Sequence, residues 1–329
     1  MKIYNKRLFI TFLLLLMVTI VCLSLGRYPK AGFTSLFKLF SDQLALNLLL
    51  NIRLPRIILA LLGGASLAAA GFVFQMIFGN PLVEPGFLGI SQASSFGSAL
   101  AILIFPFSQV AIQINAMFFG LLALFLSSTL AKRFKFGGSI LRLVLAGLTV
   151  ASLFSAALSF VKLMASPSSG LQDITFWLMG GLYNTTWHSL ISILPISLIS
   201  LSILIAYRWR LNLLALEDRY THSIGFNVQN EKRFILFIAT VATTAIISVS
   251  GIIGWVGLIV PHLARRLFGS DARNALVGSI LLGSLFLLIS DTLGRTLFST
   301  EIPLGILTSI FGSIIFVLIL SRKTTGFNV

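Results

Sequence analysis

Hydrophobic residues in this chain fall in long, nearly uninterrupted runs rather than in alternating or two-faced patterns. A helix that spans a bilayer needs roughly 20 predominantly apolar residues. Ten runs approach or exceed that length, the eighth being short. The pattern therefore predicts a single multi-span, all-α membrane domain over residues 1–329, with about ten transmembrane helices at 8–26, 56–77, 87–105, 110–131, 140–164, 188–207, 233–251, 256–268, 275–294 and 303–320.

The first run follows a short basic stretch and could be read as a signal peptide. However, it is longer than the 7–15 apolar residues of a signal core, and no A-x-A cleavage pattern follows it. Val21 before Cys22 also spoils a lipoprotein-type site. We therefore interpret residues 8–26 as an uncleaved first span.

The composition excludes a water-soluble protein and several kinds of chemistry. Hydrophobic residues make up 57%, charged residues 10%, and the mean hydropathy is +1.00. One cysteine, Cys22, allows no internal disulfide, and His188, His222 and His262 lack metal-ligand spacing. No glycine precedes a lysine, so the chain has no P-loop. We expect no metal, no cofactor and no catalytic residue, with any ATP handled by another subunit.

The placement of the positive charge predicts the orientation in the membrane. The formal net charge is +15, which in a soluble protein would suggest nucleic acid. An even number of spans places both termini on one side, and 17 of the 24 lysines and arginines fall on that side. Because cytoplasmic loops carry the excess of positive residues, both termini are expected in the cytoplasm, and the chain in the inner or plasma membrane. The charge then reflects topology, and no nucleic-acid partner is expected.

Arginines gather on the predicted outer side. Arg53 and Arg56 lie on either side of Pro55, which suits the first position of the second span. Cations at a helix N-terminus oppose the helix dipole, so this pair favours an anion from elsewhere, either a protein carboxylate or a lipid phosphate. Arg295 also lies near the outer face, and it could simply pair with Asp291 one helix turn earlier.

Two shorter segments break the membrane pattern. The loop 79–86 holds two prolines and two glycines, so it is either a pore mouth or a tight inner turn. Residues 171–182 are too short to cross, and with Trp177 and Trp187 nearby they predict a helix lying at the outer interface.

The longest polar stretch, 208–233, is predicted to lie inside. Its apolar residues Leu216, Tyr220 and Ile224 recur every four positions, which predicts a short helix that Gly225 can end. Such a helix could lie on the lipid surface. Glu217 and Asp218 on its exposed face oppose anionic headgroups, so a protein partner is favoured.

Several motifs, in this order, resemble the FecCD-type permease subunits of ABC importers for ferric siderophores, haem and cobalamin. The likeness covers nearly the whole chain. Its most specific part is the pattern G-x-x-x-F/W-x-G-L-I-V-P-H-x-x-R at 251–265, which overlaps the family-like stretch GWVGLIVPHLARRLFG at 254–269. The other parts are R-L-P-R at 53–56, G-x-x-x-Q at 71–75, N-P-L-x-x-P-x-x-L-G at 80–89, W-L-M-G at 177–180 and Ile302-Pro303-Leu304-Gly305.

The resemblance implies ten helices per subunit in the cobalamin/siderophore-type permease fold. It also implies a second permease subunit, identical or paralogous, two cytoplasmic ATPases and an extracytoplasmic binding protein. The residues that match the family's binding-protein docking positions are Arg53, Arg56 and Arg295. The matching inner gate is Asn80, Pro81, Leu82, Gly138 and Ser139, and the matching ATPase-coupling residues are Glu217, Asp218, His222, Gly225, Phe226 and Asn227.

The motifs and the resemblance favour a permease for a ferric siderophore, with haem and cobalamin as alternative cargoes. An ion-coupled secondary transporter would need membrane-buried acids, for which Asp291 is the only good candidate. A membrane enzyme acting on lipid diphosphates would need clustered acids, and the nine acids here form no such cluster.

Overall fold

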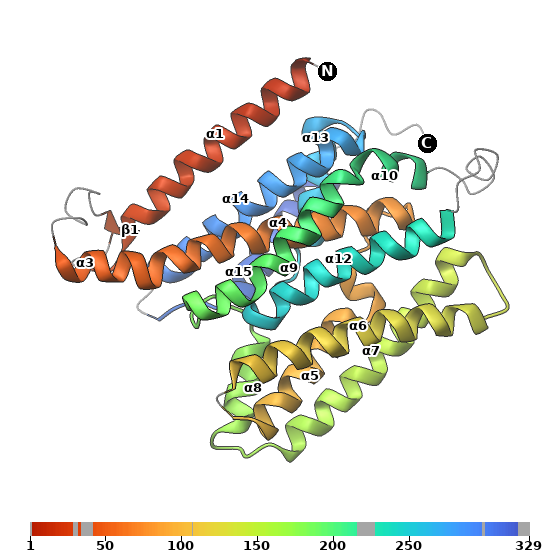
Figure 1. Cartoon of the computed structure of the whole chain (residues 1–329), viewed down its shortest axis with the longest axis horizontal. Helices are drawn as coiled ribbons and strands as arrows, with labels where there is room; N and C mark the ends of the chain where they lie inside the picture. The colour runs from red at the N-terminus through yellow and green to blue at the C-terminus, as the bar shows by residue number, and fades with distance from the viewer. Residues whose placement is uncertain are drawn as a thin grey trace.

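A computed structural model of the chain is almost entirely helical and describes residues 2–28, 32–33, 42–106, 108–215, 228–297 and 300–321 (Figure 1). Two-residue strands, β1 (Leu25–Gly26) and β2 (Gly32–Phe33), form a small antiparallel pair. The helices are α1 (Lys2–Ser24), α3 (Gln43–Leu48), η1 (Leu49–Arg53), α4 (Leu54–Phe78), η2 (Pro85–Leu88), α5 (Ile90–Ile104), α6 (Gln109–Arg133), α7 (Ser139–Met164), α8 (Gly170–Leu178), α9 (Trp187–Ala206), α10 (Arg208–Leu214), α12 (Val228–Ser250), α13 (Val256–Phe268), α14 (Ala272–Thr296) and α15 (Leu304–Ser321).

Seven described helices are long and apolar enough to cross a membrane. They correspond to the predicted runs 8–26, 56–77, 110–131, 140–164, 188–207, 233–251 and 275–294. The other three predicted runs also form helices, α5, α13 and α15, but these fall outside that set. The all-helical membrane architecture is thus confirmed, while the count of ten spans stays a prediction.

The second span begins earlier than the sequence predicted. α3, η1 and α4 form one continuous helix of 36 residues, Gln43–Phe78. Arg53 and Arg56 therefore lie inside a helix, and the prediction that they sit at its N-terminus was wrong. Pro55 has no backbone N–H to donate, and the π-helical turn η1 ends two residues before it.

The core of the bundle is the pair α4 and α14, with α12 and α13 packed against α4 (Figure 1). Almost the whole apolar window of α4 is buried. Glycines allow the closest approach: a Cβ placed on Gly64 would collide with the backbone of Gly283 on α14, and one on Gly71 would collide with Gly257 on α13. Lipid supplies no hydrophobic drive between helices, so this close backbone packing stabilises the bundle.

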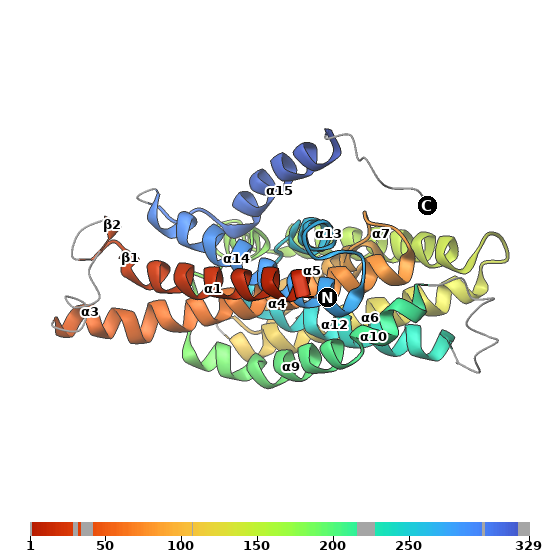
Figure 2. The same ribbon diagram turned by 90° about the horizontal axis from the view of Figure 1, so that it is seen from above.

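The remaining helices surround this core. α5, α6 and α7 pack against one another, with α8 against α5, while α9 lies on α12 and α1 lies along α14. α8 is the short helix predicted over 171–182. α15 projects away from the other helices (Figure 2), and Ile306, Ile310, Ile314 and Val317 on it are exposed.

The two ends of the bundle differ in charge. The N-terminus of α1, the α6–α7 connection, α10 and the start of α12 lie along one side, from the top to the right in Figure 1. We call it the basic end, because it carries Lys132, Arg133, Lys135, Arg142, Arg208, Arg210, Lys232, Arg233, Arg265, Arg266 and Arg273. The opposite end holds β1, β2 and α3, with Arg53, Arg56 and Arg295 close by.

Candidate functional site

The three arginines predicted for docking lie together, in a cluster with two acids. Arg56 Nε lies 2.9 Å from Asp291 Oδ1, and its Nη1 lies 2.9 Å from Glu301 Oε2. The Asp291 side chain is fully buried, whereas that of Glu301 is 42% exposed. The suggested Asp291–Arg295 pair is present at 3.8 Å, but Arg56 is the closer partner.

The other two arginines hold the end of α1. Arg295 donates to the carbonyl oxygens of Cys22, at 2.6 Å, and Leu25, at 2.8 Å. Arg53 donates to the carbonyls of Leu23, at 3.1 Å, and Tyr28, at 3.4 Å. These carbonyls lie at and after the C-terminal end of α1, where the helix leaves acceptors unsatisfied. The cluster therefore joins α1, α4 and α14, and within it Glu301 is the most exposed charged group.

The motif residues of α4 and α13 interlock. The side chain of Gln75 donates from Nε2 to the carbonyls of Gly257, at 3.3 Å, and Leu258, at 2.9 Å. Arg265 donates in turn to Gln75 Oε1. Together with the close contact of Gly71 and Gly257, these bonds fix the first turn of α13 against the second half of α4.

A second interlock joins the segments around 180, 250 and 305. Gly180 has φ +66°, and its carbonyl accepts from Leu304 N at 2.9 Å, while Gly305 N donates to Met179 O at 3.2 Å. Gly181 N donates to Ser250 O at 2.7 Å. The two motifs 177–180 and 302–305, more than a hundred residues apart in the chain, therefore meet at the C-terminal end of α12.

Between α12 and α13 the backbone is not helical. Gly251 has φ +66°, and Trp255 has φ 72°, the one positive φ of a non-glycine residue in the described part of the chain. Such a conformation costs of order 1–3 kcal/mol and persists only where the surroundings enforce it. Irregular backbone within a membrane bundle is tolerated where it is buried in protein or lines a cavity.

Two cavities flank this break. One, of about 750 Å³, is lined by Met179, Ile252, Trp255 and Gly305, and by Ile306 and Ile310 of α15. The other, of about 360 Å³, extends towards Phe87, Gln92 and Thr243. Residues 252–258 thus line both cavities, while the motifs at 177–180 and 302–305 line only the larger one.

Glu84, which is not among the site residues predicted from the sequence, lines both cavities. It lies in the loop 79–86, and its carboxyl makes no hydrogen bond or ion pair with any residue that the structure describes. The signal was available, because Glu84 is a single acid beside Pro85 in a segment that cannot form a continuous helix.

The predicted gate residues lie in two turns. Asn80 follows the left-handed Gly79 that ends α4, and its Oδ1 accepts from Leu82 N at 2.9 Å, which closes a tight turn. Asn80, Pro81 and Leu82 are exposed, as are Gly138 and Ser139 at the start of α7. The turn at Asn80, Pro81 and Leu82 leads directly to Glu84, so the loop 79–86 is both a tight turn and part of a cavity wall.

The predicted coupling residues Glu217, Asp218, His222, Gly225, Phe226 and Asn227 lie outside the described residues. The segments on either side of them are firmly attached. Arg210 Nη1 lies 2.9 Å from Glu231 Oε1, which joins α10 to α12. Asn212 donates to Asp271 at 2.8 Å and accepts from Ala272 N at 2.9 Å, which joins α10 to the start of α14. Hydrogen bonding from Arg273 holds the pKa of Asp271 well below its usual range, so this cap stays ionised at neutral pH.

A multi-span helical bundle with non-helical backbone between two cavities, and with most of its positive charge at one end, is typical of a membrane transport protein. Within that class, the chain belongs to the FecCD transport family, whose model matches residues 13–322. It is a permease of the ABC importer type.

Relatives cover almost the whole chain. The chain is 36% identical to the molybdate import system permease protein MolB of Haemophilus influenzae, over 99% of this chain and 98% of that protein. It is 34% identical to the hemin transport system permease protein HmuU of Yersinia pestis, over 97% of each. A solved structure described as an inward-facing conformation of a metal-chelate type ABC transporter matches with a TM-score of 0.89 and 34% identity, over 97% of this chain and 99% of that one.

Proposed function

We propose that this chain is the membrane-spanning permease subunit of an ABC importer that takes up a ferric siderophore or a similar iron chelate. The observation that carries the proposal is the broken backbone at 251–255 and the cavities on either side of it. A volume of about 750 Å³ falls in the range of roughly 300–1,000 Å³ that suits drug-sized ligands.

The cavities also favour one class of cargo over another. A small oxyanion such as molybdate, named for one relative, would leave most of such a cavity empty and would meet the unpaired carboxyl of Glu84. A bulky chelate fits the volume better. Haem, named for HmuU, and cobalamin, named for another relative, remain the alternatives.

The partners in this proposal are a second permease subunit, two cytoplasmic ATPases and an extracytoplasmic binding protein. The exposed apolar face of α15, of which Ile306 and Ile310 also line the larger cavity, supports a second permease copy or paralogue on that side. Both termini and the basic end would then face the cytoplasm.

Uptake by the reconstituted complex tests the function. Vesicles containing the permease, its ATPase and its binding protein are expected to accumulate ferric siderophore when ATP is supplied, and to accumulate molybdate poorly. A preference for molybdate would overturn the cargo. Accumulation driven by an ion gradient in vesicles that hold the chain alone would overturn the ABC mechanism in favour of a secondary transporter.

Docking of the binding protein is proposed at Arg53, Arg56 and Arg295. Because Glu301 already pairs with Arg56 and is the exposed acid of the cluster, an incoming carboxylate has to take its place. Glu301→Gln is therefore expected to tighten association with the binding protein several-fold at low salt. Asp173→Asn, an exposed acid on α8, is the matched control. Unchanged or weaker binding of the Glu301 variant, measured by surface plasmon resonance, would contradict this docking site.

A further inference from the structure

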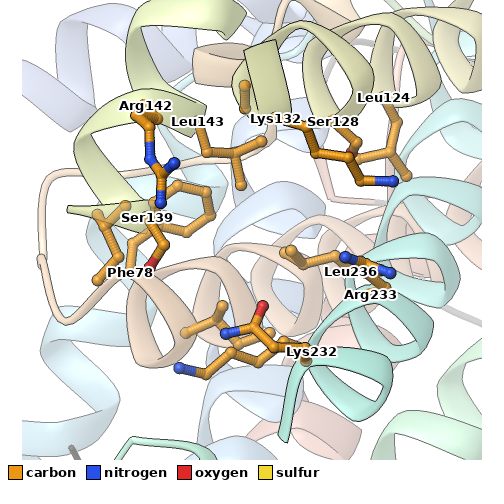
Figure 3. Close-up of a pocket in the computed structure, with 14 residues that line it drawn as sticks. Phe78, Leu124, Ser128, Lys132, Ser139, Arg142, Leu143, Lys232, Arg233 and Leu236 are labelled. Carbon is orange, nitrogen blue, oxygen red and sulfur yellow. The ribbon is translucent and has the colours of Figure 1, made fainter. Parts of the chain in front are cut away.

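A separate pocket opens at the basic end, away from the two cavities beside the broken helix. Its volume is about 420 Å³. Four helices meet there: the end of α4, the end of α6, the start of α7 and the start of α12 (Figure 3).

Four cations line this pocket: Lys132 from α6, Arg142 from α7, and Lys232 and Arg233 from α12. Figure 3 shows Arg142 on one side of the hollow, beside Ser139, with Lys132 and Arg233 on the other. Lys132 and Arg233 make no hydrogen bond or ion pair with another described residue. The Nε of Arg142 is buried without a partner, although its Nη1 donates to Phe134 O at 3.3 Å. Like charges gathered around one hollow repel, and a bound anion would offset that repulsion.

No acidic side chain is among the pocket-lining residues that the structure describes. The adjacent acid on α12, Glu231, is engaged by Arg210 at 2.9 Å. Among the described residues, no carboxylate pairs with Lys132, Arg142 or Arg233 in this pocket.

The rest of the wall is apolar. Phe78, Leu124, Ile140 and Leu143 line it, and Ile140 is exposed at the side of α7. A pocket with clustered Lys and Arg above an apolar wall suits a phosphate group attached to a greasy chain, because both side chains bind phosphate and basic pockets between membrane helices bind anionic headgroups.

We propose that this pocket binds a phosphate group, supplied by the headgroup of an anionic phospholipid whose acyl chain lies along Ile140 and Leu143. The same cations would also accept free inorganic phosphate, so the experiment separates the two sources.

Native mass spectrometry of the purified full chain tests the proposal, with phosphatidylglycerol, phosphatidylcholine and inorganic phosphate as separate probes. The pocket variant is Arg142→Gln with Arg233→Gln. The control is Arg133→Gln with Lys135→Gln, two exposed cations at the same end that do not line the pocket. Each basic residue near an anionic lipid contributes about 1 kcal/mol, so the pocket variant is expected to lose about thirtyfold in phosphatidylglycerol affinity. Phosphatidylcholine is expected to bind both variants alike.

Each result decides the point. Selective loss of phosphatidylglycerol in the pocket variant supports a lipid headgroup site. Loss of inorganic phosphate alone supports the phosphate site and overturns its lipid source. Equal loss in both variants, or none in either, overturns the proposal, provided that size-exclusion elution shows both variants to be folded as the parent.

Discussion

At the scale of single residues, the arginine cluster shows what sequence spacing can and cannot reveal. The Asp291–Arg295 spacing of four residues on one helix correctly indicated a local pair. The nearer partner of Asp291, Arg56, lies 235 residues away, and nothing in the sequence links the two. Removing the partner of a buried charge leaves it uncompensated, which costs far more than losing an exposed pair.

The two pairs of Arg56 give a matched stability test. Arg56→Gln leaves the fully buried Asp291 with only the more distant Arg295, and is expected to destabilise the protein by about 3 kcal/mol. Glu301→Gln removes a partner that is 42% exposed, and is expected to cost less than about 1 kcal/mol. Thermal unfolding in detergent measures both. Similar melting temperatures for the two variants would show that the buried pair contributes little.

At the scale of helices, the apolar runs predicted where helices occur, and the structure places a helix at each of them. The start of the second span was missed because Pro55, a usual first-turn residue, lies in the interior of a longer helix. The sequence also showed that glycines are common in the spans, but not which ones touch. That depends on which helices are neighbours, and α4 and α14 are brought together only by the complete fold.

Alanine variants of two adjacent glycines of α4 distinguish the effect of close helix packing from the effect of helix propensity. A Cβ on Gly64 would meet the backbone of Gly283, which cannot move aside, so Gly64→Ala is expected to destabilise the bundle by about 1–3 kcal/mol. A Cβ on Gly63 would meet only side-chain methyl groups, of Leu287 at 3.2 Å and Ile246 at 3.4 Å. Gly63→Ala is therefore expected to be close to neutral, because alanine favours a helix by about 1 kcal/mol over glycine. The order of the two melting temperatures is the readout, and a reversed order would refute the assigned packing.

At the scale of the whole molecule, the motifs read from the sequence as separate patterns become neighbours. The motifs at 71–75 and 254–269 interlock through Gln75, and those at 177–180 and 302–305 meet beside Gly251. Sequence alone identified the motifs but could not predict that those at 177–180, 251–265 and 302–305 line one cavity, because residues so far apart in the chain are brought together only by helix packing. Glu84 differs from these motifs, because its position beside Pro85 was a signal in the sequence, and the structure adds only that it lines both cavities.

The contacts that hold α10 against α12 and α14 lead to a prediction about how the permease binds its ATPase in the complete transporter. Ion pairing of Arg210 with Glu231, and the hydrogen bonds of Asn212 to the start of α14, fix both flanks of the predicted coupling segment to the bundle. A movement of residues 216–227, driven by the ATPase, would therefore be transmitted to α12 and α14, and through α12 to the non-helical backbone at 251–255.

Glu217→Lys with Asp218→Lys is expected to abolish co-purification of the ATPase, because two positive charges would replace two negative charges at the proposed contact. Asp173→Lys is the control: this residue lies on α8, away from the basic end, so the variant is expected to co-purify with the ATPase as the parent does. Retention of the ATPase by the double variant would place the coupling contact elsewhere on the basic end.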